Sequence, residues 1–221
     1  GCKGVCEGLP MQTVQDLAPP DLCADGRCLD EGLLHGLPEM LRQVRGTQLL
    51  VLHQLGNHGP SYFRRYPPAF ARFQPECRSD DLRTCSQQEI VNAYDNALLY
   101  TDHVLAQLVT QLQAHAETLD SALIYVSDHG ESLGENNLYL HGLPYAIAPD
   151  VQKQVPMLMW LSPGLAAAQR LDLGCLRARA AQPAAHDHVF HTLLGLLDIT
   201  TALYDPAWDL GRPCRPVSPS T

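Results

Sequence analysis

The sequence has no long apolar run. Its 221 residues contain no segment near the roughly 18 consecutive apolar residues of a transmembrane helix. The start of the chain also lacks the basic stretch and apolar stretch of a signal peptide. With 45% hydrophobic residues, a chain of this length can bury one substantial core. We therefore expect one compact, soluble domain.

Positive charge is scarce, and several catalytic motifs are missing. The formal charge of -9 argues against nucleic acid as a partner. The chain contains no His-Glu-x-x-His, no Gly-x-Ser-x-Gly and no Walker loop. An obvious activated nucleophile is absent too, because neither Thr13 nor Thr47 follows a strand at a turn into a helix.

No Cys-x-x-Cys pair occurs among the eight cysteines, which argues against a zinc ribbon or a thioredoxin-like site. Six of the cysteines form three close pairs instead, which we interpret as local disulfides in an oxidising compartment. Free buried thiols are the alternative. Eight cysteines allow many pairings, so the connectivity is a guess: Cys2 with Cys6, Cys23 with Cys28, Cys77 with Cys85, and Cys175 with Cys214.

Apolar periodicity predicts the main elements. They are a helix at 29–44, a strand at 48–54, a long helix opened by a Ser86–Glu89 capping box, strands at 122–127 and 155–161, and a helix at 186–197. The long helix is expected to bury an apolar stripe that includes Leu98, and residues 162–183 look irregular. Strand, helix and strand in this order form a right-handed parallel crossover. We therefore expect an α/β fold with a mixed, mainly parallel sheet and helices on both faces. Three strands are few for such a sheet, so the pattern favours a partial domain.

The second strand ends at Asp128 and His129 and enters a glycine-rich loop. Ligands of open α/β sheets bind beyond the carboxyl ends of the strands, and carboxylate plus imidazole suits zinc or manganese. His58 follows the first strand, and His141 lies in the loop after the second. We expect all four residues to converge at one edge of the sheet as a metal site. Taken singly, each has a structural alternative as a turn cap or a satisfied loop histidine.

Other polar residues are weaker candidates. Glu131 and Glu135 could orient the imidazoles, although loop carboxylates are usually just solvated. Lys3 has an ammonium suited to a phosphate oxygen, although a surface lysine is the ordinary interpretation. His186 and Asp187 are interpreted as the start of the last helix.

Three long motifs make the chain recognisable. Tyr-Val-Ser-Asp-His-Gly-Glu-Ser-Leu-Gly-Glu with Tyr-Leu-His-Gly-Leu-Pro-Tyr-Ala-Ile-Ala-Pro, His-Gln-Leu-Gly-Asn-His-Gly-Pro-Ser-Tyr, and Asn-Ala-Tyr-Asp-Asn-Ala closely resemble the periplasmic domain of phosphoethanolamine transferases. That family belongs to the alkaline phosphatase and sulfatase superfamily and includes the lipid A enzymes of polymyxin (colistin) resistance. The resemblance runs from Cys2 to about Leu210, nearly the whole chain.

The resemblance implies a zinc-dependent transfer of phosphoethanolamine from phosphatidylethanolamine to a lipid A phosphate. Asp128 and His129 would be zinc ligands. His58 and His141 would contact the transferred group or a second zinc, and Lys3 would approach the phosphate.

The resemblance also implies what would precede residue 1: the threonine nucleophile, a glutamate zinc ligand and the membrane helices. The parent protein would lie at the periplasmic face of the Gram-negative inner membrane. Residues 1–221 would be a soluble, monomeric part of its catalytic domain that binds zinc weakly and is inactive alone.

Two other functions stay open at this point. One is a phosphatase or sulfatase of the same superfamily, although the nearest match to a sulfatase Cys-x-Pro-x-Arg motif, Cys-Arg-Pro-Val-Ser from Cys214, lacks the arginine. The other is a non-catalytic metal-binding module. The residues also do not define the acceptor, which is lipid A or a core sugar.

Overall fold

The computed structural model describes residues 8–216, which divide into two compact units. The first unit comprises residues 8–44, 48–111 and 129–155, and the second comprises 45–47, 112–128 and 156–216. Lys3 and the expected Cys2–Cys6 disulfide lie outside the described residues. None of the helices in the described part of the chain is long and apolar enough to cross a membrane.

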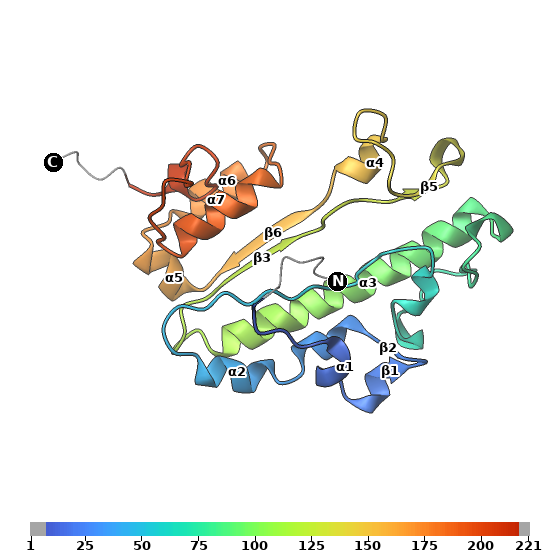
Figure 1. Ribbon diagram of the computed structural model, residues 1–221, viewed down its shortest axis with the longest axis horizontal. Coiled ribbons are helices and arrows are strands. Elements are labelled where there is room, and N and C mark those ends of the chain that lie inside the picture. Colours follow the sequence, from blue (N-terminus) through green and yellow to red (C-terminus); the bar gives the residue numbers. More distant parts are fainter. Residues whose placement is uncertain (1–7, 217–221) are drawn as a thin grey trace. The chain divides into compact units, whose positions relative to one another are not determined.

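The first unit holds a long helix, short helices and two small hairpins (Figure 1). The helices are α1 (Val14–Leu17), α2 (Leu37–Gln43), α3 (Gln87–Ala114), whose last three residues belong to the second unit, and α4 (Asp150–Lys153). The strands are β1 (Cys23–Ala24) with β2 (Arg27–Cys28), and β4 (Ser132–Leu133) with β5 (Tyr139–Leu140). Short 3-10 helices lie at Pro20–Leu22, Asp30–Leu34, Tyr62–Arg64, Pro68–Phe70, Leu82–Thr84 and Glu135–Asn137.

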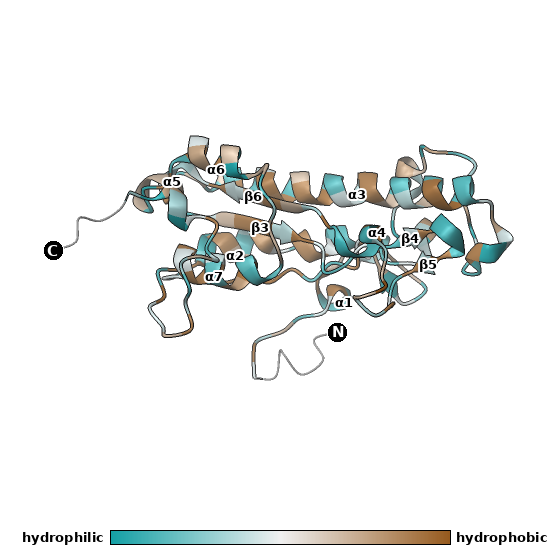
Figure 2. Ribbon diagram, turned by 90° about the horizontal axis from the view of Figure 1, so that it is seen from above, coloured by the Kyte–Doolittle hydropathy of each residue, from teal (hydrophilic) through white to brown (hydrophobic). Residues whose placement is uncertain are grey.

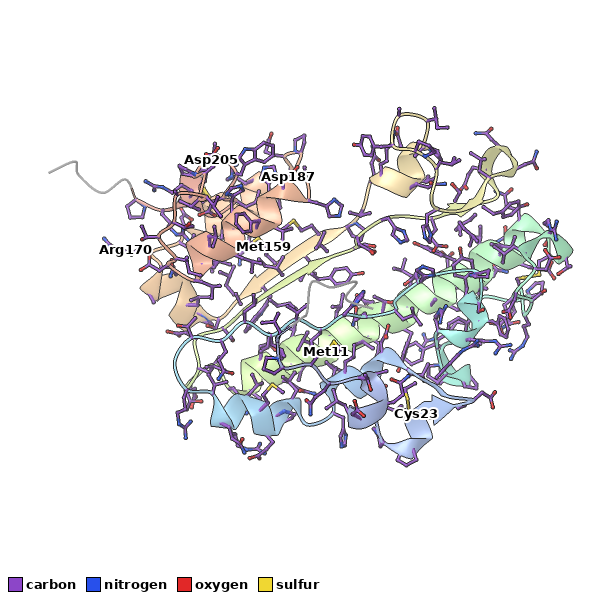
Figure 3. All side chains as sticks on the ribbon, viewed as in Figure 1. Met11, Cys23, Met159, Arg170, Asp187 and Asp205 are labelled. Atoms are coloured by element: carbon purple, nitrogen blue, oxygen red, sulfur yellow. A yellow bond between two sulfur atoms is a disulfide. The ribbon has the colours of Figure 1, made fainter. Side chains whose placement is uncertain are left out.

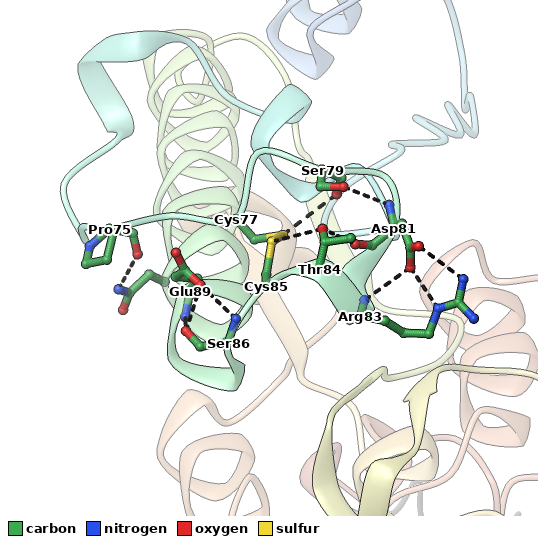
Figure 4. The surroundings of a disulfide bond; sticks show 10 residues. Pro75, Cys77, Ser79, Asp81, Arg83, Thr84, Cys85, Ser86 and Glu89 are labelled. Carbon is green, nitrogen blue, oxygen red and sulfur yellow. Dashed lines mark hydrogen bonds and ion pairs between the residues drawn. A yellow bond between two sulfur atoms is a disulfide. The ribbon is translucent and has the colours of Figure 1, made fainter.

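The long helix α3 confirms the prediction from the capping box. The Ser86 backbone N–H and hydroxyl donate to the Glu89 carboxylate at 2.7 and 2.8 Å (Figure 4). These bonds satisfy groups that a helix N-terminus otherwise leaves unpaired. The helix buries Ile90, Ala97 and Val104 at helical spacing, and apolar and polar residues alternate along it (Figure 2). Leu98, which we expected on the buried stripe, is exposed.

The core of the first unit lies between α3 and the segment before it. Its buried residues are Tyr62, Cys77, Leu82, Ile90 and Ala93. Leu133, Tyr139 and Leu140 of the β4–β5 hairpin pack against this cluster. The hairpin that follows the Asp-His pair is therefore fixed to the same core as the segment that carries His58.

Three expected disulfides are confirmed. Cys23 bonds Cys28 across the β1–β2 hairpin (Figure 3), Cys77 bonds Cys85 just before α3 (Figure 4), and Cys175 bonds Cys214 in the second unit.

The second unit is built on two antiparallel strands. β3 (Ala122–Val126) pairs with β6 (Met157–Leu161), with Ala122 opposite Leu161 (Figure 1). Both strands and the last helix, α7 (Asp187–Leu196), were predicted. The expectation of a mainly parallel sheet was wrong for the described residues, where all three pairings are antiparallel.

Residues 162–183, expected to be irregular, contain two helices. They are α5 (Pro163–Ala168) and α6 (Leu173–Arg179). Ser162 caps the first through a bond from Leu165 N, and Asp172 caps the second through bonds from Gly174 N and Cys175 N. Ser and Asp favour this position because their oxygens accept from first-turn N–H groups. A 3-10 helix at Arg212–Cys214 closes the unit.

Two other expectations need correction in the first unit. The predicted strand at 48–54 is irregular and largely exposed, and it forms no ladder with any described segment. The predicted helix at 29–44 is a 3-10 helix at Asp30–Leu34 followed by α2. Pro38 lies in the first turn of α2, where its missing N–H costs no helical bond.

Candidate metal centre

Three histidines converge in the first unit. His58, His129 and His141 offer ligand atoms that all lie within 4.8 Å of one another. The His129 and His141 rings stack with centroids 3.8 Å apart, and His58 meets them edge-on at 5.8 and 4.9 Å. The structure therefore brings together three of the four residues that we expected to meet. The fourth, Asp128, is exposed and belongs to the second unit.

An oxygen engages the Nδ1 atom of each imidazole. His58 Nδ1 lies 2.7 Å from Gly59 O, and His129 Nδ1 lies 3.0 Å from Gly130 O. His141 Nδ1 lies 3.3 Å from Glu131 Oε1. Donation from Nδ1 places the lone pair on Nε2, which is the form in which histidine binds a metal. Three imidazoles prepared in this way form a donor set suited to zinc.

Glu131 connects two of these histidines. It is only 8% exposed, and its Oε1 accepts from Gly59 N at 2.9 Å and lies against His141. Its Oε2 accepts from the Tyr62 hydroxyl. One buried carboxylate thus holds both the backbone after His58 and the ring of His141, the orienting role that the sequence suggested. Glu135, the other candidate, instead accepts from Leu133 N at 2.7 Å within its own turn.

The loop that carries His58 is held by two polar residues that sequence reasoning missed. Both carboxylate oxygens of Asp30 accept from consecutive backbone N–H groups, Leu55 at 3.0 Å and Gly56 at 2.7 Å. The Asn57 amide donates to a backbone carbonyl of α3 at 3.1 Å. The Asn-His pair in the His58 motif was the available signal for Asn57. Asp30, 28 positions before His58, had none.

Burial raises the pKa of the Tyr62 phenol, and its hydrogen bond to Glu131 raises it further. The folded protein therefore keeps Tyr62 neutral at a pH where the unfolded chain ionises it, near the usual tyrosine value of about 10. Stability from this group is complete below about pH 10 and falls as the pH rises above it. We expect Tyr62→Phe to reduce the alkaline loss of unfolding free energy, measured by urea denaturation at neutral and alkaline pH.

The same substitution removes one buried hydrogen bond, which costs about 1 to 2 kcal/mol at neutral pH. Tyr145→Phe is the matched control, because Tyr145 is exposed and its replacement should leave both values unchanged. An alkaline slope identical in Tyr62→Phe and the unmodified chain would contradict the buried, neutral phenol.

Comparison with known proteins shows the family to which the chain belongs. The family model described as Sulfatase matches residues 1–199, so the chain belongs to the sulfatase family. Among its relatives, phosphoethanolamine transferase EptA of Escherichia coli K12 is 48% identical over 219 residues, covering 99% of this chain and 40% of the relative. Phosphatidylethanolamine transferase Mcr-1 of Escherichia coli is 41% identical over 205 residues, covering 90% and 36%. The chain thus spans about two fifths of the length of these relatives.

Solved structures of phosphoethanolamine transferases are similar to the chain as well. The soluble domain of lipooligosaccharide phosphoethanolamine transferase A from Neisseria meningitidis superposes with a TM-score of 0.93 at 41% identity, covering 98% of this chain and 65% of that one. The periplasmic domain of EptC from Escherichia coli, in complex with Zn, gives 0.72 at 25% identity, covering 89% and 54%. These matches confirm the α/β class, the partial domain and the resemblance to phosphoethanolamine transferases.

Proposed function

We propose that residues 1–221 are part of the periplasmic catalytic domain of a phosphoethanolamine transferase. The group would move from phosphatidylethanolamine to a phosphate of lipid A, at the periplasmic face of the inner membrane of a Gram-negative cell. The observation that carries the proposal is the cluster of three oriented histidines, in a chain 48% identical to a phosphoethanolamine transferase. The lipooligosaccharide transferase with a TM-score of 0.93 supports a lipid-linked acceptor.

His58, His129 and His141 would hold zinc through Nε2. For His58 and His141, metal binding fits this arrangement better than phosphate contact, because their rings lie against His129 and their Nδ1 atoms are already engaged. Asp128 is proposed as a further ligand and Lys3 as a phosphate contact. When bound, zinc would neutralise charge on the phosphoryl oxygens and lower the pKa of a hydroxyl nucleophile.

Within this function the chain's own residues have defined tasks. Glu131 fixes the ring of His141, and the Gly59 and Gly130 carbonyls fix those of His58 and His129. The nucleophile is proposed to be a threonine outside residues 1–221, as the resemblance implies. We therefore expect the isolated chain to bind zinc without turning over.

The first test is zinc affinity, measured by titration calorimetry on the 221-residue chain. We expect His141→Ala to lower the affinity about 10- to 100-fold or more, because it removes a ligand. His53→Ala is the control, since His53 is exposed and outside the cluster. Equal zinc affinity for His141→Ala and the unmodified chain would overturn the metal centre.

The second test is the product. Lipid A from cells expressing the full-length protein should carry added phosphoethanolamine, detected by mass spectrometry, and His141→Ala should abolish it. An unchanged lipid A would sink the acceptor assignment. Free phosphoethanolamine without any phosphoethanolamine-modified lipid would indicate a hydrolase, and zinc binding with neither product would indicate a non-catalytic module.

A further inference from the structure

A loop that begins one residue after His141 exposes an unusual concentration of apolar side chains. Residues 142–149 read Gly-Leu-Pro-Tyr-Ala-Ile-Ala-Pro and contain no charge. Tyr145 is 80% exposed and Ile147 is 69% exposed, and Leu143 and Val151 are also exposed. Single exposed apolar residues are ordinary on protein surfaces, but a contiguous group marks a binding surface. We call residues 142–149 the apolar loop, and Val151 of α4 extends its exposed surface.

The apolar loop has a defined conformation in the first unit. The backbone N–H groups of Ile147 and Ala148 both donate to Pro144 O at 2.9 Å, which closes a turn. Ala148 is buried beneath it. Pro144 and Pro149 restrict the backbone at either side of the exposed residues. The tip is therefore presented by a formed turn and has no need to fold before it binds.

The loop is also fixed to the histidine cluster. It runs into α4, where Gln152 O accepts from Gly130 N at 3.1 Å and the Gln152 amide donates to the buried Ser132 hydroxyl at 2.8 Å. Gly130 follows His129, and its carbonyl engages that ring. The loop therefore begins beside one histidine of the cluster and ends on the backbone that orients another.

An ion pair lies beside the apolar tip. Lys153 Nζ is 5.3 Å from the centre of the Tyr145 ring and 3.4 Å from Asp150 Oδ1. Tyrosine and lysine next to aliphatic side chains are characteristic of segments at the boundary between lipid headgroups and acyl chains. Tyrosine places its ring at headgroup level, and lysine keeps its charge in water while its stem contacts apolar surface.

We propose that the apolar loop inserts into the outer part of a phospholipid bilayer and so brings lipid-borne substrate to the histidine cluster. The inference rests on the proposed function for its substrate, but the surface itself is defined by the loop. Tyr145 and Ile147 enter the boundary of the acyl chains, and the Asp150–Lys153 ion pair stays at the level of the headgroups. A bilayer fits better than a folded protein partner, because the surface is a short uncharged tip of aromatic and aliphatic side chains, flanked by one ion pair, Asp150 with Lys153, whose charges balance.

The test is sedimentation of the 221-residue chain with vesicles of phosphatidylethanolamine and phosphatidylglycerol. We expect the chain to bind these vesicles. The double variant Tyr145→Ser, Ile147→Ser should bind them at least about tenfold more weakly. Leu203→Ser is the matched control, because Leu203 is 70% exposed in the second unit and its loss should change nothing. A Tyr145→Trp variant should show a blue-shifted emission and quenching by brominated lipid.

Three results would overturn the inference: no binding of the unmodified chain, equal binding of the double variant, or a dimer in solution that the double variant dissociates. Zinc titration of each variant keeps the two proposals apart. Zinc binding without vesicle binding rejects the apolar loop and leaves the metal centre standing. Vesicle binding without zinc binding rejects the metal centre and leaves the apolar loop standing.

Discussion

Glu131→Ala should be among the most damaging single substitutions in the first unit. It removes the acceptor of the Gly59 N–H and the Tyr62 hydroxyl, both buried, together with the partner of His141 Nδ1. A buried donor left without a partner costs about 1 to 3 kcal/mol, so two of them predict a loss of about 2 to 6 kcal/mol in unfolding free energy. Urea denaturation of the Glu131→Ala variant and of the unmodified chain measures this loss directly.

The same substitution should also weaken zinc binding about 10- to 100-fold, the usual effect of removing a residue that orients a metal ligand. Glu131→Gln separates the two effects, because the amide keeps the volume and one acceptor oxygen but loses the charge. We expect Glu131→Gln to recover most of the stability and only part of the zinc affinity. If Glu131→Ala unfolds at the same urea concentration as the unmodified chain, the buried carboxylate is not the link between the two histidine loops.

The elements that sequence predicted well are those whose signals are local. The capping box and the helical period of α3 lie within the helix itself. β3, β6 and α7 likewise carry their apolar patterns in a few consecutive residues. The segment at 48–54 has an equally good strand pattern, but a strand exists only when another backbone pairs with it. That partner is not encoded in the seven residues, and none of the described segments supplies it.

The convergence of the histidines was predicted for a reason that was only partly correct. We expected parallel strand ends to bring His58 to His129, but residues 48–57, which lead into His58, form no strand. Its position comes instead from long-range hydrogen bonds on either side of it. The backbone N–H groups of Leu55 and Gly56 donate to Asp30, and that of Gly59 donates to Glu131. Such bonds join residues 25 to 72 positions apart. They leave no periodic pattern, so only the resemblance could place these residues near one another before the structure.

Gly130→Ala should damage the site through the backbone. A Cβ atom at residue 130 would lie 2.0 Å from Val151 O and 3.1 Å from Val151 C. Both are backbone atoms of α4, so no side-chain rotation relieves the overlap. Either α4 shifts, losing the Gly130 N to Gln152 O bond, or the backbone at Gly130 turns away. Overpacking of this kind costs about 1 to 3 kcal/mol.

Both ways of relieving the overlap disturb the carbonyl that engages His129 Nδ1. We therefore expect Gly130→Ala to lower the zinc affinity about 10- to 100-fold as well as the stability, measured by calorimetry and urea denaturation on the same preparations. Gly174→Ala in α6 is the control, since its Cβ would meet only the Asp172 side chain, at 3.1 Å. Alanine favours a helix over glycine by up to about 1 kcal/mol, so this control should be near neutral in stability and unchanged in zinc binding. Unaltered zinc binding in Gly130→Ala would mean that the tight approach of α4 does not orient His129.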